Sequence, residues 1–360
     1  MFAAVLETVP TKELVLIDDI SLRDMAPDDV RVKISHSGVC HSDLSCMNGT
    51  IPQEVPAVLG HEGAGVVLEV GENVSHVDPG DHVVIAFSPP CGSCLFCTER
   101  HQPNLCMTGF FSMHNNLQFR QGSRSIGSMM GCGTFAEETI VPGIATVKID
   151  DDISLDVAAL IGCGVTTGVG AALNTAQVTP GSSVVVIGCG GVGIAAIQGA
   201  RIAGASVIVA IDLHEGKLER AKSFGATHGA VPDEVPGVLA EITGGEGFDF
   251  ALECIGTSST MRQAFDLIRR GGTCCIVGVG RAEETFALSA FEMFFSEKTI
   301  VGSMYGSADV RTDFNRFLGL YRSGQLDLEG MISRRISLND INDAMDSMGD
   351  ADVVRQVIDF

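Results

Sequence analysis

The chain is poor in positive charge. Its 23 lysines and arginines stand against 45 aspartates and glutamates, which gives a formal net charge of −22. Nucleic acids and anionic membranes repel so acidic a surface, so neither is expected as a partner. The N-terminus lacks a basic segment followed by a long apolar run, which argues against a secretory signal. With no internal repeat or low-complexity segment either, the chain is predicted to be a cytoplasmic globular protein.

Long apolar runs are also scarce. One stretch, residues 183–211, is apolar enough to suggest a membrane span, but it contains six glycines together with Gln198 and Arg201. Glycine at this density favours a strand, a turn, a helix and a second strand over one continuous helix. The stretch is therefore expected to belong to a globular domain.

The length of the chain and a change in its pattern of predicted strands and helices predict two domains. Up to about residue 150, short β-rich runs alternate with glycine and proline turns, at 30–36, 65–70 and 82–86. From about residue 179, strands alternate with helices, as expected for a parallel sheet covered on both faces. The expected elements there are 183–187, 193–203, 206–211, 217–224, 248–253 and 273–277, followed by a helix at 310–323 and a closing run at 339–360. The predicted class is therefore α/β.

The glycine turn Gly188-Cys-Gly190-Gly191-Val-Gly193 lies between a predicted strand and a predicted helix, as in dinucleotide-binding sites. Glycine at 188 permits a tight turn, glycine at 190 lets the main chain approach a pyrophosphate, and glycine at 193 lets the helix pack on the sheet. Asp212 ends the next strand, where a carboxylate accepts hydrogen bonds from ribose hydroxyls and repels a 2′-phosphate. The pattern favours NAD over NADP, even if Asp212 also caps the following helix.

Four of the twelve cysteines lie within sixteen residues: Cys91, Cys94, Cys97 and Cys106. Their clustering and the missing secretory signal favour reduced thiols and metal sites over disulfides. Four thiolates complete a tetrahedral zinc shell without water, which predicts a structural zinc. An iron–sulfur cluster is the rival, but its fourth cysteine usually follows after three residues and precedes proline, whereas Cys106 is distant and precedes Met107. Unmetallated surface thiols are the remaining alternative.

A second metal site is predicted from three glycine-flanked residues, Cys40, His61 and Cys163. Two thiols and one imidazole form an incomplete ligand set, which leaves a fourth position on zinc free for chemistry. Such a zinc acts as a Lewis acid on an alcohol or carbonyl oxygen, and a neighbouring nicotinamide exchanges hydride with the substrate. Asp43 is a candidate to orient the imidazole of His61, with a solvent-exposed turn carboxylate as the alternative.

Together these motifs resemble those of the zinc-dependent medium-chain alcohol dehydrogenases. The likeness covers essentially the whole chain, from G-V-C-H-S-D-L through G-H-E-G-A-G, C-G-S-C-L-F-C, G-C-G-V-T-T-G and G-C-G-G-V-G to V-R-Q-V-I-D-F. It implies a β-rich GroES-like catalytic domain from residues 1–164 and 305–360, around an inserted Rossmann domain with a doubly wound parallel sheet at 165–304. It also implies one catalytic zinc, one structural zinc, NAD, and a homodimer or homotetramer.

The resemblance implies roles for individual residues. Cys40, His61 and Cys163 would hold the catalytic zinc, and Glu62 would approach the metal when the fourth ligand exchanges. Ser42 would take the substrate proton. The other implied contacts are those of the substrate pocket (Phe87 and Ile51), the nicotinamide (Thr167 and Val192), the adenosine ribose (Asp212 and Lys217) and the pyrophosphate (His41 and Arg355).

Two departures from the family pattern bear on function. The best-known alcohol-oxidising members end their proton relay in a histidine where this chain has Ser45, so the proton is expected to leave through water or another group. The loop between Cys97 and Cys106 has eight residues where seven is usual, and a surface loop accommodates one extra residue at little cost.

We therefore expect an NAD-dependent zinc alcohol dehydrogenase acting on primary aliphatic or aromatic alcohols and aldehydes. The run that begins G-C-G-V-T-T-G also resembles thiol-adduct formaldehyde dehydrogenases and bacterial enzymes that hold their nicotinamide tightly. Oxidation of a formaldehyde–thiol adduct would require an anion-recognising patch, for which Arg120 and Arg124 are candidates unless they are merely exposed loop residues. The apolar Phe87 and Ile51 disfavour a polyol. A zinc- and NAD-binding protein without turnover is the last alternative.

Overall fold

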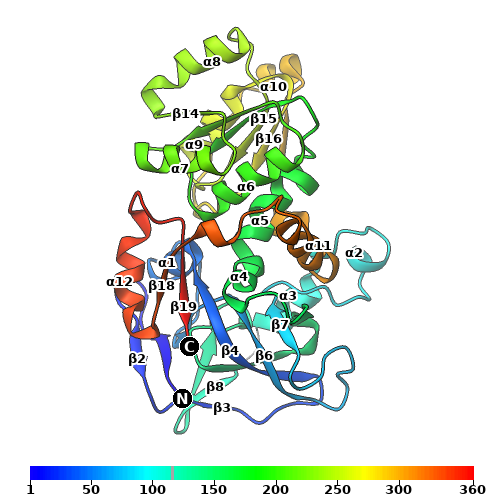
Figure 1. Cartoon of the computed structure of the whole chain (residues 1–360), viewed down its shortest axis with the longest axis vertical. Coiled ribbons are helices and arrows are strands. Elements are labelled where there is room, and N and C mark those ends of the chain that lie inside the picture. The colour runs from blue at the N-terminus through cyan, green and yellow to red at the C-terminus, as the bar shows by residue number, and fades with distance from the viewer. Residues whose placement is uncertain (115–116) are drawn as a thin grey trace.

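The structure is a computed structural model that describes residues 1–114 and 117–360. A β-rich part that contains both termini lies at one end of the molecule, and a parallel sheet with its helices lies at the other (Figure 1). The short helices α4 (Leu155–Leu160) and α5 (Thr166–Gly170) lie between them. The predicted α/β class is confirmed.

Two sheets form the β-rich part. The first has the order β2-β1-β5-β9-β8-β3, and the second has the order β11-β7-β6-β4-β19-β18, with β10 also paired to β4. The strands of the first are β1 (Ala3–Leu6), β2 (Val15–Ile17), β3 (Ser21–Leu22), β5 (Ala57–Val58), β8 (Phe119–Gln121) and β9 (Arg124–Ser128). Those of the second are β4 (Asp29–Val39), β6 (Glu62–Val70), β7 (His82–Ile85), β10 (Glu138–Pro142), β11 (Thr146–Lys148), β18 (Ile332–Ile336) and β19 (Arg355–Asp359). The predicted strands at 30–36, 65–70 and 82–86 correspond to β4, β6 and β7.

The last strand returns to the first half of the chain. β19 pairs antiparallel with β4, with Gln356 opposite Val39 and Asp359 opposite His36. Both ends of the chain therefore build one sheet, and Arg355 at the start of β19 comes to lie beside the segment that precedes α1 (His41–Met47). The boundaries at residues 164 and 305 stay predictions.

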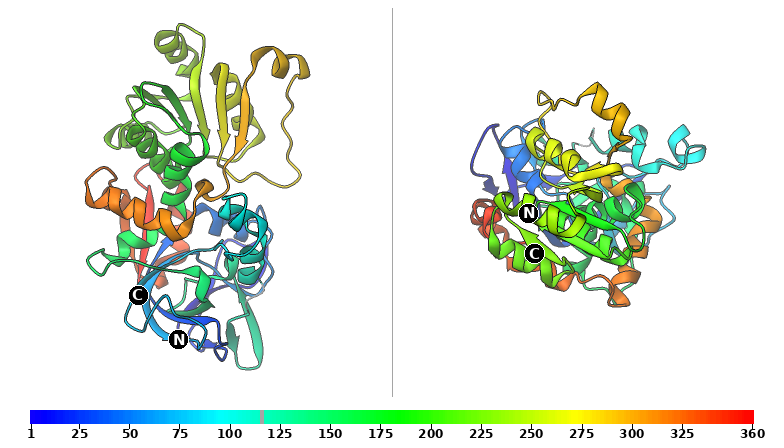
Figure 2. Two further views of the ribbon diagram at one scale, coloured as in Figure 1. Left: turned by 90° about the vertical axis from the view of Figure 1, so that its right-hand side faces the viewer. Right: turned by 90° about the horizontal axis from the view of Figure 1, so that it is seen from above.

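The parallel sheet has the order β14-β13-β12-β15-β16-β17. Its strands are β12 (Ser183–Ile187), β13 (Val207–Ile211), β14 (His228–Ala230), β15 (Phe248–Glu253), β16 (Ile268–Ile276) and β17 (Thr299–Gly302). Alternate residues of β12 belong to two separate cores. Val184 packs in the core that contains Ile194 of α6 (Gly191–Ile202), and Val185 packs in the core that contains Phe265 of α9 (Ser258–Leu267). Helices thus cover both faces (Figure 2), as predicted for a doubly wound sheet.

The predicted helices at 193–203, 217–224 and 310–323 correspond to α6, α7 (Glu215–Ser223) and α11 (Val310–Arg322). The remaining helices are α2 (Leu95–Thr98), α3 (Met107–His114), α8 (Val235–Thr243), α10 (Ala290–Ser296) and α12 (Ile341–Asp346). Residues 155–175 form one helical stretch long and apolar enough to span a membrane, but 89% of its apolar 18-residue window is buried inside the protein, as in a core helix. Sequence analysis did not predict this helix.

Candidate functional site

Four side chains able to bind a metal converge in the interior of the protein. Their donor atoms all lie within 4.8 Å of one another, and we call them the donor cluster: Cys40, His61, Glu62 and Cys163. All four are buried. Cys40 directly precedes α1, Glu62 begins β6, and Cys163 lies in the π-helical turn η4 (Ile161–Val165) between α4 and α5. A π-turn inside a helix frequently marks a functional site.

The chemistry of the donor cluster fits zinc. Nε2 of His61 is buried and has no hydrogen-bond partner among the described residues, as expected of an atom that binds a ligand. The hydrogen bond between the two thiols lowers the pKa of Cys40 well below its usual value and raises that of Cys163 well above it. Two deprotonated thiols and one imidazole would give a zinc ion three protein ligands.

Asp43 contacts two members of the donor cluster, Cys40 and His61. Its Oδ2 accepts a hydrogen bond from the backbone N–H of Cys40 at 2.9 Å, and its Oδ1 accepts one from the N–H of Gly60 at 3.0 Å. The same Oδ1 lies 3.3 Å from Nδ1 of His61. The side chain is fully buried, so the alternative of a solvent-exposed turn carboxylate is wrong. Such a carboxylate fixes the ring and directs its other nitrogen to the metal.

Glu62 connects the donor cluster to Arg355. Burial raises the pKa of Glu62 to about 7, although the positive charge of Arg355 opposes that shift. Its Oε1 accepts a hydrogen bond from the N–H of Gly164 at 3.1 Å and lies 3.3 Å from Nη2 of Arg355. A Cβ on Gly191 would lie 2.7 Å from the same guanidinium. Arg355 therefore extends from the donor cluster to the first turn of α6.

The glycine turn has the geometry that its spacing predicts. Gly188 has a φ of +93°, a backbone angle that residues with a side chain rarely adopt. A Cβ on Gly193 would lie 1.7 Å from the carbonyl oxygen of Gly188, so the helix can pack on the strand only with glycine there. A Cβ on Gly190 would meet no atom of the described residues within 4 Å. The space in front of Gly190 is thus left open by the protein and suits a bound phosphate at the N-terminus of α6.

Asp212 supports this turn from the end of β13. Its Oδ2 accepts a hydrogen bond from the N–H of Cys189 at 2.8 Å, and its Oδ1 accepts one from the N–H of His214 at 3.1 Å. The residue that caps α7 is His214, so the interpretation of Asp212 as the helix cap is wrong. Each carboxylate oxygen keeps a lone pair for a ribose hydroxyl.

The helix that follows Cys163 packs directly on the dinucleotide helix. A Cβ on Gly168 of α5 would lie 2.3 Å from the carbonyl oxygen of Val192 in α6. Thr167 and Val192 are both half-buried beside this close approach. His41 begins α1 and Lys217 lies in the first turns of α7; desolvation and the positive charges of Arg355 and Lys217 lower the pKa of His41. Of these implied cofactor residues, His41 directly follows Cys40 and Thr167 lies four positions after Cys163, so both adjoin the donor cluster.

Of the implied proton acceptor and pocket residues, Ser42 and Phe87 lie near the donor cluster, whereas Ile51 packs elsewhere. Ser42 Oγ lies 3.8 Å from Sγ of Cys40. The ring of Phe87 stands edge-on to the imidazole of His61, with centroids 5.9 Å apart. Ile51, which follows α1, packs against a different core, so its role in the pocket stays a prediction.

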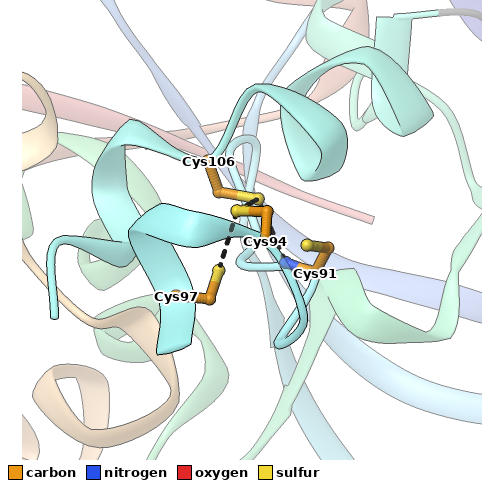
Figure 3. A group of neighbouring side chains, drawn as sticks. All are labelled: Cys91, Cys94, Cys97 and Cys106. Carbon is orange, nitrogen blue, oxygen red and sulfur yellow. Dashed lines mark hydrogen bonds between the residues drawn. The ribbon is translucent and has the colours of Figure 1, made fainter. Parts of the chain in front are cut away.

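The cysteine quartet forms a second potential metal site, shown in Figure 3. The sulfur of Cys94 lies 3.6 Å from those of Cys97 and Cys106. The sulfur of Cys106 also accepts hydrogen bonds from the N–H groups of Cys91 and Gly109, each at 3.3 Å. The longer loop therefore does not keep Cys106 from the group. All twelve cysteines are free thiols, and four of them converging here fit a closed zinc site.

Sequence reasoning missed three apolar residues at the carboxyl edge of the parallel sheet. Leu213 follows β13, Ile255 follows β15 and Val279 follows β16, and they are 75%, 47% and 60% exposed. Exposed apolar side chains at the edge where doubly wound sheets bind ligands suit the flat faces of a dinucleotide's rings. The available signal was an apolar residue two or three positions after the end of each strand.

The arginines considered for an anion-recognising patch lie elsewhere. Arg120 and Arg124 belong to the β8–β9 hairpin, which lies near the termini at the end of the molecule remote from the parallel sheet (Figures 1 and 2). Arg124 forms an ion pair with Glu7 at 2.5 Å. The expectation that these arginines could flank the substrate pocket is not supported by their position.

Comparisons with known proteins agree with this geometry. Residues 26–151 match the model of the alcohol dehydrogenase GroES-like domain, and residues 191–322 match that of the zinc-binding dehydrogenases. The chain is 39% identical to an S-(hydroxymethyl)glutathione dehydrogenase of Synechocystis sp., over 94% of this chain and 95% of the relative. It is 38% identical to an NDMA-dependent alcohol dehydrogenase of Amycolatopsis methanolica, over 95% and 94%. The crystal structure of benzyl alcohol dehydrogenase from Acinetobacter calcoaceticus superposes with a TM-score of 0.91 at 30% identity, covering 100% of this chain and 99% of that one. The predicted GroES-like and Rossmann components are thereby confirmed.

Replacing Cys163 by serine should remove one of two bound zinc ions. A serine hydroxyl is a far weaker zinc ligand than a thiolate, while the glycine turn is untouched. Elemental analysis of the purified variant should give about one zinc per chain, and its affinity for the dinucleotide should stay within about threefold of the unaltered protein. Cys132→Ser is the matched control, because Cys132 is also buried but lies outside the donor cluster. Two zinc ions in Cys163→Ser would contradict the assignment.

Alanine at two glycines of the turn should separate ligand binding from folding. Gly190→Ala should melt within a few degrees of the unaltered protein, since its Cβ meets no described atom, but bind dinucleotide at least about tenfold more weakly. Gly193→Ala should lower the melting temperature strongly, because its Cβ would collide with the carbonyl of Gly188. Calorimetry and dinucleotide titration measure both effects. If Gly190→Ala binds dinucleotide as tightly as the unaltered protein, the space in front of Gly190 does not hold the dinucleotide.

Proposed function

The chain belongs to the zinc-dependent medium-chain alcohol dehydrogenases, and from that premise we propose that it interconverts primary alcohols and aldehydes with NAD. The observation that carries the proposal is the contact of two chemically distinct sites. The donor cluster and the glycine turn share Arg355, which lies 3.3 Å from Glu62 and against Gly191. Oxidation of an alcohol by hydride transfer requires this proximity of Lewis acid and nicotinamide.

A bound zinc would supply a Lewis acid that lowers the pKa of an alcohol, and a bound NAD would supply the hydride acceptor. Cys40, His61 and Cys163 would hold the metal, and Asp43 would keep Nε2 of His61 directed at it. Ser42 receives the proton of the alcohol. Because Ser45 stands where a terminal histidine would continue the relay, the proton passes from Ser42 to water.

The contact between Glu62 and Arg355 would fix the position of the cofactor relative to the donor cluster. The guanidinium lies at the N-terminus of α6, where it and His41 would bind the pyrophosphate of the cofactor. Asp212 and Lys217 hold the adenosine ribose, and a 2′-phosphate would be repelled by Asp212, which selects NAD. Thr167 and Val192 support the nicotinamide, and Phe87 shapes the substrate pocket. The quartet holds a structural zinc that takes no part in the reaction.

A second candidate is oxidation of an S-hydroxymethyl thiol, which the name of the relative from Synechocystis favours. A negatively charged thiol carrier needs cationic partners at the pocket, and the position of Arg120 and Arg124 in the remote hairpin gives this candidate no such support. We therefore place simple alcohols first. By resemblance to the family, we also propose a cytoplasmic homodimer or homotetramer.

Turnover with a panel of substrates tests the proposal. The zinc-loaded protein should reduce NAD with primary aliphatic and aromatic alcohols and show little activity with S-hydroxymethylglutathione. Stopped-flow or steady-state absorbance of NADH gives kcat/KM for each, alongside a count of two zinc ions per chain. Activity confined to the thiol adduct would establish the second candidate. Absence of turnover with every alcohol, aldehyde and adduct would reject both.

Replacing Asp212 by glycine should weaken NAD and relax the choice between cofactors. The variant loses both the ribose acceptor and the repulsion of a 2′-phosphate, so the NAD to NADP preference should fall by at least about tenfold. Asp212→Asn is the companion variant, because it keeps acceptor oxygen and removes only the negative charge. An unchanged preference in Asp212→Gly would remove the ribose role from this residue.

A further inference from the structure

Three consecutive residues after β17 adopt left-handed backbone angles. Tyr305, Gly306 and Ser307 have φ values of +53°, +65° and +50°. Only glycine tolerates this conformation freely, so tyrosine and serine there are strained and must be held by their surroundings. Strain of this kind concentrates at functional sites. None of the sequence motifs pointed to this turn.

The surroundings hold the turn from the side of α5. Thr175 exchanges a hydrogen bond with the hydroxyl of Ser307 at 2.7 Å, and Nδ2 of Asn174 donates to the carbonyl of Gly306 at 3.2 Å. A Cβ on Gly306 would lie 2.2 Å from the carbonyl oxygen of Thr166. The turn is thus pressed against the helix that follows Cys163.

The locked turn directs the side chain of Tyr305 at the donor cluster. The ring is 2% exposed and stacks on Phe87, with centroids 4.0 Å apart and planes inclined by 29°. Phe87 in turn stands edge-on to His61. Phe87 therefore contacts both Tyr305, by stacking, and the imidazole of His61, in a T-shaped arrangement.

The hydroxyl of Tyr305 makes a second contact with the same site. It donates a hydrogen bond to the carbonyl of Gly162, the residue directly before Cys163 in η4. The neighbours Met304 and Ser307 line a cleft of about 740 Å³ at the carboxyl ends of β16 and β17. One strained turn therefore separates this cleft from the donor cluster.

We propose that Tyr305 is a positioning and specificity-determining residue: its ring fixes Phe87 against His61 and limits the width of the space beside the donor cluster. This inference rests on the proposed alcohol dehydrogenase function. Among primary aliphatic alcohols, a space limited in this way favours an unbranched chain such as that of 1-butanol over a chain that is branched next to the carbinol carbon. The hydroxyl has a separate task, which is to fix the carbonyl before Cys163.

Substitutions that remove the ring or only the hydroxyl distinguish the two tasks. Tyr305→Leu should raise kcat/KM for 2,2-dimethyl-1-propanol relative to 1-butanol about tenfold, because Phe87 gains room to turn aside. Tyr305→Phe should keep that ratio within about twofold, but shift the visible absorption of the cobalt-loaded protein through the altered position of Cys163. Phe119→Leu, at a fully buried phenylalanine of another core, is the matched control and should change neither.

A double-mutant cycle tests whether Tyr305 acts through Phe87. Phe87→Leu alone should raise the same ratio, and adding Tyr305→Leu should raise it little further, because both changes free the same space. An unchanged ratio in Tyr305→Leu, or an equal rise in Phe119→Leu, overturns the proposal. If Tyr305→Leu does not fold, an unchanged ratio in Phe87→Leu overturns it instead.

The failure of this inference can be told apart from failure of the proposed function. The two alcohols are also titrated into the cobalt-loaded proteins, and the change in visible absorption gives their relative affinities without any turnover. A chain that binds both alcohols but oxidises neither would reject the proposed function. Equal relative affinities in the unaltered protein and Tyr305→Leu would reject the role of Tyr305.

Discussion

A buried ion pair between Arg355 and Glu62 joins the two functional parts of this molecule. The guanidinium is 5% exposed and the carboxylate fully buried, so neither charge has bulk water to stabilise it. Removal of one partner from such a pair typically costs about 3–5 kcal/mol. Arg355 begins β19 and Glu62 begins β6, so the pair forms only after the last strand has joined β4. The same guanidinium strengthens the positive end of α6, the place we propose for the anionic cofactor.

The two metal sites differ because the chain builds them differently. The quartet comes from one continuous segment, its four thiols face one another, and no further donor is needed. The donor cluster gathers Cys40, His61 and Cys163 from three distant segments and relies on Asp43 to align two of them. A closed set of four thiols favours a structural role, whereas a three-ligand set beside a half-buried hydroxyl favours catalysis.

The long-range packing explains where sequence analysis succeeded and where it did not. Strands β12 and β15 match their predicted bounds. The continuous apolar run of β12 ends at Gly188, and the mainly apolar run of β15 ends three residues before Gly256. β16 begins five residues earlier than expected, at Ile268 instead of Thr273, because pairing with β15 extends through a register shift near Phe248. The helix at 155–175 was missed because it is apolar on all sides and carries no amphipathic period. The sequence does not show where Arg120 and Arg124 lie relative to the donor cluster. Only the folded β8–β9 hairpin places them far from it.

The sequence alone determined the metal donors, the glycine turn and Asp212 as candidates, because each is a local pattern whose spacing has a chemical reason. Tertiary structure decided which of those groups meet. The contact of Asp43 with the N–H of Gly60, the pairing of Arg355 with Glu62 and the stacking of Tyr305 on Phe87 join residues far apart in the chain. Such contacts depend on how whole strands and helices pack, and no local pattern of residues encodes them.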